Sequence, residues 1–223
     1  SYVGDQLVDN NCDIIIKGLG GVSISEYYDQ CLSLFHVQQG GATIYTKSTG
    51  HSLDGHWQVD AGASIIFFAT PNVDQSVPMN PAKFVNNGLV YGRVKFTGNT
   101  STTLQGNGKY DRMEIDKTGA QVWLESTTLV TYEFILSRGR IVLNQFDLKL
   151  GTATISFTSN LDSYIETNGT GSCEITCKAG LSSFYPIGKN DFAPFAVEFP
   201  LAAAQALVKV RVTDNFYGEY NGI

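Results

Sequence analysis

The chain has few charged residues: only 16% of its 223 residues are Asp, Glu, Lys or Arg, against roughly 25% in ordinary soluble domains. No run of Lys or Arg occurs anywhere, and the net charge is −6. A basic arm that would neutralise nucleic-acid phosphates is therefore missing, so we expect RNA to be contacted only indirectly. Scarce charge also indicates a surface that is partly covered by other subunits.

Long apolar runs are absent as well. The longest are Ser64–Ala69 and Leu201–Leu207, far short of the ~20 residues that cross a bilayer. We therefore expect no membrane partner. No signal peptide is recognisable, and the chain begins at Ser1 instead of Met, which predicts a processed product or a trimmed chain.

The four cysteines form no metal motif. They are Cys12, Cys31, Cys173 and Cys177, and the last two stand in SCEITCKAG without a nearby His. A zinc site needs a second pair of ligands at similar spacing. Residues four apart in a strand lie ~13 Å from each other on the same face, too far for a disulfide. We expect buried free thiols, with a disulfide as the alternative.

No catalytic constellation is evident. His51 and His56 share a polar loop with Asp54, but their spacing matches no zinc motif, and no G-x-S-x-G nucleophile motif occurs. His36 stands among apolar residues and is expected to be a hydrogen-bonded core or interface residue. The sequence predicts no catalytic residue, no metal and no cofactor, and hence a protein that is not an enzyme.

Three carboxylates gather in DRMEIDK. Asp111, Glu114 and Asp116 predict a solvated face, on which Glu114 and Asp116 share one side of a strand. A glycosidase would need two carboxylates facing each other across a cleft, which local spacing cannot establish. Trp57 and Trp123 could stack on sugar in a lectin, but a single Trp is more often part of a core or its rim.

Two glycosylation sequons occur, at Asn99 and Asn168. Both lie in predicted loops, where a glycan could be attached. Such tripeptides arise often by chance in a chain rich in Ser, Thr and Asn, so they are weak evidence for secretion.

The chain does contain many segments with the alternating pattern of β-strands. Apolar residues make up 43%, and many segments alternate apolar and polar positions, which is typical of strands. In Leu89–Thr97, for example, one face carries Val90, Gly92, Val94 and Phe96, and the other carries Tyr91, Arg93 and Lys95. Ile65–Phe68 has no polar alternation, so it is expected to be buried on both faces. Strands are predicted at 13–17, 42–48, 58–71, 89–97, 121–124, 129–136, 140–150, 152–159, 174–178 and 207–213.

One helix is predicted near the start. Ser23 and Glu26 fit a capping box, and a helix over 25–35 would align Tyr28, Leu32 and Phe35 on one face. A helical turn or an extended connection is expected over 201–206. Residues 1–11 are expected to form an extended arm, and 71–88, 98–109 and 160–173 to be long loops.

These elements predict an all-β fold in a single domain spanning 1–223. About eight to ten strands with turns between them favour an antiparallel sandwich or barrel. No repeat of 20 to 50 residues is evident.

The stretch Gln30–Pro71 resembles part of the capsid proteins of picorna-like viruses. A short amphipathic segment is followed by QGG, the strand ATIYTKSTG, a loop with Trp57 and the strand SIIFFATP. The end, EFPLAAAQALVKVRVTDNFYGEYNGI, resembles the closing strand of the same proteins, with Asp214, Phe216 and Gly218 in the final motif. The likeness is greatest to the small coat proteins of comovirus-like (secovirus) viruses and to dicistrovirus-like coat proteins. Gly-Gly stands where such proteins often carry Trp-Arg or Trp-Lys.

This resemblance implies an antiparallel jelly roll of about eight strands with one or two short helices. It also implies a structural role: copies of this chain and sister capsid proteins would form an icosahedral shell around RNA, in virions assembled in the host cytoplasm. A host receptor is a further expected partner.

Two other functions stay open: a receptor-binding spike or tail domain of a virus or phage, and a secreted carbohydrate-binding β-sandwich. The 25–35 segment discriminates between the first of these and the capsid. If it is a strand instead of a helix, the capsid resemblance loses half of its support and the spike becomes the better hypothesis.

Overall fold

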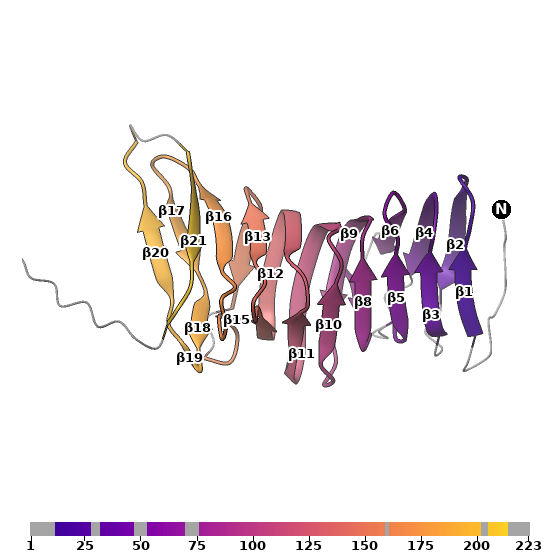
Figure 1. Cartoon of the computed structure of the whole chain (residues 1–223), viewed down its shortest axis with the longest axis horizontal. Helices are drawn as coiled ribbons and strands as arrows, with labels where there is room; N and C mark the ends of the chain where they lie inside the picture. Colours follow the sequence, from indigo (N-terminus) through magenta and orange to yellow (C-terminus); the bar gives the residue numbers. More distant parts are fainter. Residues whose placement is uncertain are drawn as a thin grey trace, which may run out of the picture.

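The chain forms a stack of parallel β-strands. The structure is a computed structural model and describes residues 12–27, 32–46, 53–69, 76–158, 161–201 and 205–213. These residues contain twenty-one strands and no helix. Figure 1 shows the strands following one another along the long axis, as a β-solenoid of about seven turns. The predicted all-β class is confirmed, but the antiparallel jelly roll is wrong.

One side of the solenoid is a ladder of parallel strands. Each strand pairs in parallel with the strand one turn later, with the registers Phe35↔Trp57, Trp57↔Phe84, Phe84↔Leu104 and Leu104↔Leu124. The strands of this side are β1 (Cys12–Ile16), β3 (Leu32–Val37), β5 (His56–Val59), β8 (Lys83–Asn86), β10 (Thr102–Gln105), the ends of β11 and β12, β15 (Ile165–Glu166) and β18 (Ile187–Lys189).

The remaining strands close each turn. They form a second parallel ladder that continues through the long strands β11 and β12. Its members are β2 (Gly21–Tyr27), β4 (Gly41–Thr46), β6 (Ser64–Ala69), β9 (Leu89–Phe96), β11 (Lys109–Leu124), β12 (Thr128–Val142), β13 (Leu148–Gly151) and β16 (Cys173–Cys177), with β7 (Ser76–Met79) and β14 (Thr154–Phe157) pairing along β9 and β12.

The turns have a constant length in the middle of the chain. Leu89, Lys109, Leu129 and Lys149 occupy equivalent positions in four successive turns, each 20 residues after the one before. The sequence prediction that no such repeat exists is therefore wrong. The repeat is hard to see because equivalent inward positions share only apolar character, as in Val94, Met113, Phe134 and Ile155.

The inside of the solenoid is a continuous apolar core. Phe35 stacks on Trp57 with ring centroids 4.5 Å apart, and Trp57 stacks on Phe84 at 6.4 Å. Because equivalent side chains lie one above another at the ~4.8 Å spacing of strands, large residues form rows along the axis. One such row is Ala42, Ile65, Val90, Tyr110 and Val130, all buried.

The opening segment differs from prediction in two ways. Ile44 and Tyr45 lie in a strand as expected, but β2 runs to Tyr27 and β3 starts at Leu32, so the 25–35 helix is wrong; residues 28–31 lie outside the described residues. Pairing with β1 and β5 outweighs the local helical spacing. The strand Ile65–Phe68 also alternates, because its second and fourth residues point outward.

The three predicted long loops contain strands. β7 and β8 lie within 71–88, β10 within 98–109 and β15 within 160–173. These strands have two to four residues each, which is too short for an alternation signal. Pro78 is tolerated because β7 is an edge strand, where a missing N–H costs no ladder bond.

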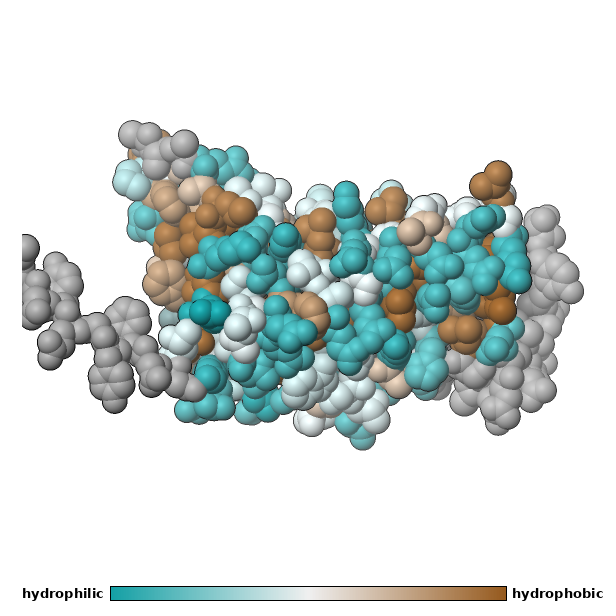
Figure 2. All heavy atoms as spheres, in the orientation of Figure 1, coloured by the Kyte–Doolittle hydropathy of each residue, from teal (hydrophilic) through white to brown (hydrophobic). Residues whose placement is uncertain are grey.

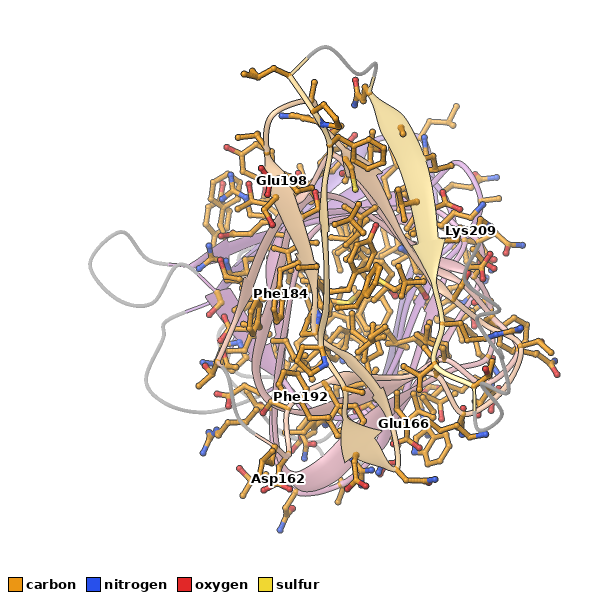
Figure 3. All side chains as sticks on the ribbon, turned by 90° about the vertical axis from the view of Figure 1, so that its left-hand side faces the viewer. Asp162, Glu166, Phe184, Phe192, Glu198 and Lys209 are labelled. Carbon is orange, nitrogen blue, oxygen red and sulfur yellow. The ribbon has the colours of Figure 1, made fainter. Side chains whose placement is uncertain are left out.

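Antiparallel pairing is confined, within the described ranges, to the C-terminal end. There β16 pairs with β21 (Ala206–Val210), β17 (Ser182–Tyr185) with β20 (Phe195–Glu198), and β18 with β19 (Asp191–Phe192). Figure 3 looks onto this end, with β20 and β21 on its two sides and apolar side chains between them. Of the predicted 201–206 segment, Ala206 begins β21, while residues 202–204 and the predicted arm 1–11 lie outside the described residues.

Candidate functional site

Five neighbouring strands each present one large side chain to solvent. Tyr45 on β4, Phe68 on β6, Tyr91 on β9, Arg112 on β11 and Tyr132 on β12 form what we call the aromatic strip. Its four rings are between 44% and 59% exposed. Several large exposed rings on neighbouring strands are uncommon on a protein surface unless they meet a partner.

The strip is held together by ring contacts. Tyr45 and Phe68 face each other in register and stack with centroids 5.5 Å apart. The guanidinium of Arg112 lies 4.5 Å from the centroid of the Tyr132 ring, a cation–π contact that orients both side chains. These contacts orient three of the four rings, those of Tyr45, Phe68 and Tyr132.

An irregularity in β9 positions the third ring. Gly92 has a φ of +84°, and a Cβ there would lie 2.2 Å from the carbonyl oxygen of Phe67. Only glycine fits such a left-handed position against a neighbouring backbone. Tyr91 before it therefore pairs with β6 through Ile66, while Arg93 after it pairs with β7 through Ser76.

Beside the strip lies a network of ion pairs. Lys95 contacts both Glu114 and Asp116, with N–O distances of 3.1 and 3.0 Å. Asp116 also binds Arg138, and Arg93 binds Glu133 at 2.5 Å. With the pair of Arg112 and Asp111, the network contains four cations and four carboxylates and is electrically balanced. The cations are Arg93, Lys95, Arg112 and Arg138, and the carboxylates are Asp111, Glu114, Asp116 and Glu133.

The network fixes the ionisation of its central groups. Burial alone raises the pKa of Asp116, but hydrogen bonds from Arg138 and Lys95 outweigh it and hold the pKa below its ordinary 3.8. Burial alone lowers the pKa of Lys95, but its contacts with Asp116 and Glu114 prevail and raise it. A general acid needs a raised carboxyl pKa, so Asp116 does not suit the role of the general acid in glycoside cleavage.

The prediction for the carboxylates Glu114 and Asp116 is correct for the side of the strand that they share and wrong for their exposure to solvent. Glu114 and Asp116 do share one side of β11, as their common partner Lys95 shows. They are only 6% and 9% exposed, however, instead of solvated. Sequence spacing could not reveal the cations that cover them, because Lys95 and Arg138 come from the neighbouring strands β9 and β12.

The other candidate residues are scattered. His36 bonds Asp60 at 2.9 Å, in agreement with the predicted hydrogen-bonded role, whereas His56 is exposed and His51 lies outside the described residues. Trp57 belongs to the core and Trp123 is half-buried on the opposite side of its strand ladder.

The thiols and the sequons lie as predicted where they are described. Cys173 and Cys177 are free and buried, and burial raises the pKa of Cys173. Cys31 lies outside the described residues, and the side chain of Cys12 is not among those described. Asn99 and Asn168 are both exposed between strands, although their glycosylation stays a prediction.

The aromatic strip itself was missed by sequence reasoning. A Tyr or Phe in an alternating strand is assigned to the core or to the surface only when the inward face is known. The one available signal was that Tyr91 alternates with Val90 and Val94 of the core. Tyr132 carries no such signal, because it lies two residues from both Val130 and Phe134, which are buried.

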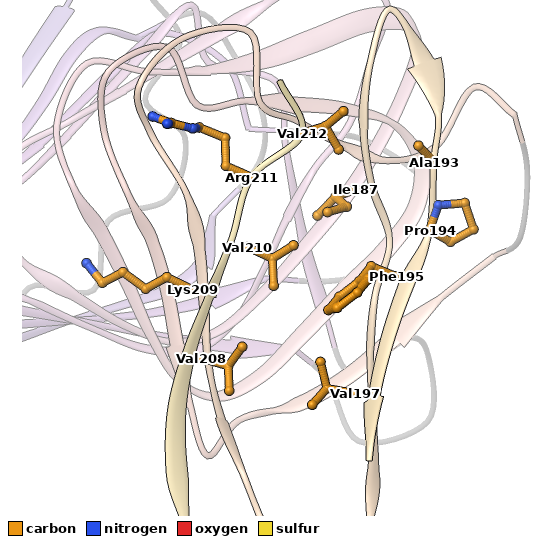
Figure 4. Close-up of a pocket in the computed structure, with 10 residues that line it drawn as sticks. All are labelled: Ile187, Ala193, Pro194, Phe195, Val197, Val208, Lys209, Val210, Arg211 and Val212. Carbon is orange, nitrogen blue, oxygen red and sulfur yellow. The ribbon is translucent and has the colours of Figure 1, made fainter. Parts of the chain in front are cut away.

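A second surface lies at the C-terminal end. A groove of about 440 Å³ separates β20 from β21 and is lined mainly by apolar side chains, among them Ile187, Phe195, Val197, Val208 and Val210. Figure 4 shows these groups pointing toward each other across the groove, and Figure 2 shows apolar surface gathered at the same end. The basic groups at its rim are occupied: Lys209 binds Asp147 at 3.0 Å, and Arg211 donates to the Thr170 carbonyl at 3.0 Å.

Within the described ranges, no cluster of three or more His, Cys, Asp or Glu could hold a metal ion. No helix among those residues is long and apolar enough to span a membrane. No family model, curated protein or solved structure matches the chain.

Proposed function

We propose that this chain is a receptor-binding segment of a spike or fibre, of the kind found on viruses and phages, and that it binds neutral glycans along the aromatic strip. The single observation that supports this most is the placement of four exposed rings and Arg112 on five neighbouring strands. Sugar rings present apolar faces of C–H groups that stack on such aromatic faces.

The spacing of the strip suits a chain of sugars. Strands of a parallel ladder are ~4.8 Å apart, which is close to the length of one pyranose unit in an extended glycan. Rings repeated at this spacing can contact successive sugars of one chain, so weak contacts add up along the rod.

The charges of the face favour a neutral ligand. Each described cation of the network has a carboxylate within salt-bridge distance, and the four positive and four negative groups balance. An anionic glycan would need an excess of positive charge, which this face does not have. The polar groups can still hydrogen-bond hydroxyls at the edge of the stacked sugars.

The coat-protein hypothesis depended on a jelly roll and on a helix over 25–35. Neither is found: the described part of that segment belongs to strands β2 and β3. Strands in the described part of 25–35 are the outcome that favours the spike over the capsid, and a rod of stacked turns suits a spike that projects toward a receptor.

The test is a screen of the full chain against neutral and acidic polysaccharides by glycan array, followed by titration calorimetry on the best ligand. We expect binding to neutral glycans. Tyr91→Ala and Tyr132→Ala should each weaken it about fivefold, the equivalent of roughly 1 kcal/mol for a lost ring contact.

Leu181→Ala is the matched control, because Leu181 is 56% exposed but lies at the C-terminal end, away from the strip. It should leave affinity unchanged. Binding that is equally sensitive to all three substitutions, or that is confined to acidic glycans, would contradict the proposal.

A further inference from the structure

Lys117 is a lysine inside the solenoid. It lies near the middle of β11, and its side chain is among the largest that are fully buried, with 1% exposure. Burying an ammonium group away from water is costly unless it is hydrogen-bonded. The surroundings of this lysine therefore need an explanation.

The amine has three oxygen neighbours. Nζ donates to Oδ1 of Asn80 at 2.9 Å, to the carbonyl of Thr97 at 2.5 Å and to that of Thr100 at 2.9 Å. Asn80 is held in turn, because the Thr100 hydroxyl donates to the same Oδ1 at 3.0 Å. Cγ of Asn80, the carbon of the carboxamide, is bonded to the Oδ1 that contacts the amine and therefore lies close to Nζ of Lys117.

A carboxylate stands on the preceding turn. Leu53 forms a parallel bridge with Met79, and the N–H of Asn80 donates to the Leu53 carbonyl at 2.9 Å. Asp54 therefore follows Leu53 just as Asn80 follows Met79. The field of Asp54 acts on Lys117, since it raises the pKa of the amine and opposes the larger lowering by burial.

We propose that Lys117 and Asn80 form an intramolecular isopeptide bond, with Asp54 as the group that moves the proton. Nζ attacks Cγ of Asn80, the Nζ–Cγ bond forms, and the Cγ–Nδ2 bond breaks. The Asp54 carboxylate takes one proton from Nζ and gives it to Nδ2, which leaves as ammonia. No oxidant, reductant or cofactor is required.

The site provides what a nucleophilic amine needs. Burial lowers the pKa of Lys117 from 10.5 to about 8, so a usable fraction carries a free lone pair at neutral pH. In that form its two N–H bonds satisfy the Thr97 and Thr100 carbonyls, which directs the lone pair toward the Asn80 amide.

The residue after Asn80 excludes the usual side reaction of asparagine. In an ordinary chain the next backbone nitrogen can attack Cγ and form a succinimide. Here the next residue is Pro81, which has no N–H. The carboxamide of Asn80 is therefore protected from its own backbone and remains available to Lys117.

The experiment is intact-mass spectrometry of the denatured full chain. We expect a mass below that of the sequence by one ammonia, about 17 Da. After trypsin, the peptides 48–83 and 113–138 should appear as one branched species that is uncut after Lys117. The branched peptide separates this outcome from a succinimide at Asn87 or Asn107, which precede glycines.

Three variants complete the test. Lys117→Met and Asn80→Ala should restore the full mass. Asp54→Asn should also restore it, or slow the mass loss from hours to days, in a protein whose circular dichroism spectrum is unchanged. The unchanged spectrum shows that the variant is folded. If Asp54 has only a structural role, the folded Asp54→Asn variant should keep the mass deficit. Full mass and no branched peptide in the natural chain would overturn the proposal.

Discussion

Replacing Trp57 by Ala should be among the most destabilising single changes in the chain. The indole is 1% exposed and stacks between Phe35 and Phe84, with its edge on Phe67. A buried aromatic removes on the order of 200 Å² from water, or about 5 kcal/mol at 25 cal/mol/Å². Measured Trp→Ala costs of about 3 to 5 kcal/mol agree with that figure.

The substitution also removes a hydrogen bond, since Nε1 donates to the Asp54 carbonyl at 3.0 Å. We therefore expect a loss of about 4 kcal/mol in the free energy of unfolding. The damage should begin in the turns around β5, because each turn of a solenoid contacts only its neighbours.

Trp123 supplies the matched control, because it is the other Trp of the chain and is only half-buried. Urea unfolding followed by circular dichroism measures both variants with one probe. Trp123→Ala should cost about 1 kcal/mol or less. Equal costs for the two substitutions would refute the assignment of Trp57 to a packed row in the core.

Three further outcomes are expected. Gly92→Ala should lower the free energy of unfolding in urea by more than about 2 kcal/mol, because its Cβ would meet a backbone oxygen. Gly62 is the control: it has a φ of +80° and nothing within 4 Å of a Cβ, so Gly62→Ala should cost only about 1 kcal/mol. In a chain with the other cysteines replaced by Ser, Cys173 should react with a thiol reagent only at the rate of unfolding, since its burial raises its pKa and blocks access; rapid reaction in the folded protein would contradict this. The pKa of Asp116 is lower in the folded than in the unfolded chain, so its ionised form stabilises the fold at pH values above the unfolded-state pKa. This stabilisation is lost as the pH falls through the folded-state pKa, so Asp116→Asn should flatten the decline of melting temperature below about pH 4.

The proposed isopeptide bond would matter for a projecting rod. It would join residues that are 37 apart in the sequence. By the chain-entropy relation used for disulfides, closing such a loop raises the free energy of the unfolded state by about 4 kcal/mol and stabilises the folded state by the same amount. A covalent link between turns would also stop the solenoid from opening one turn at a time.

The sequence alone determined the local character of the chain. The alternation in Leu89–Thr97 predicted a strand with Val90 and Val94 inward; the strand is Leu89–Phe96, and both valines are buried. The lack of a metal motif and of a disulfide spacing around Cys173 predicted a buried free thiol, and Cys173 is free and buried. These inferences succeed because the period of two and the burial of apolar groups are properties of the strand itself.

The tertiary structure decided how the strands pair. A strand with one buried face has the same alternation in an antiparallel sandwich as in a parallel solenoid, so the pattern could not distinguish the two. The 20-residue repeat was hidden because the core selects apolar volume at each position and not a particular residue. The helix predicted at 25–35 failed because pairing with neighbouring turns outweighed local spacing.

The candidate sites depended on the turns even more strongly. Tyr45, Tyr91 and Tyr132 lie on one surface only because a turn advances by one strand spacing, which places residues distant in sequence side by side. Lys117 and Asn80 meet for the same reason, although no motif connects them. The sequence determines which side chains each strand carries, whereas the length of each turn determines which of these side chains come into contact.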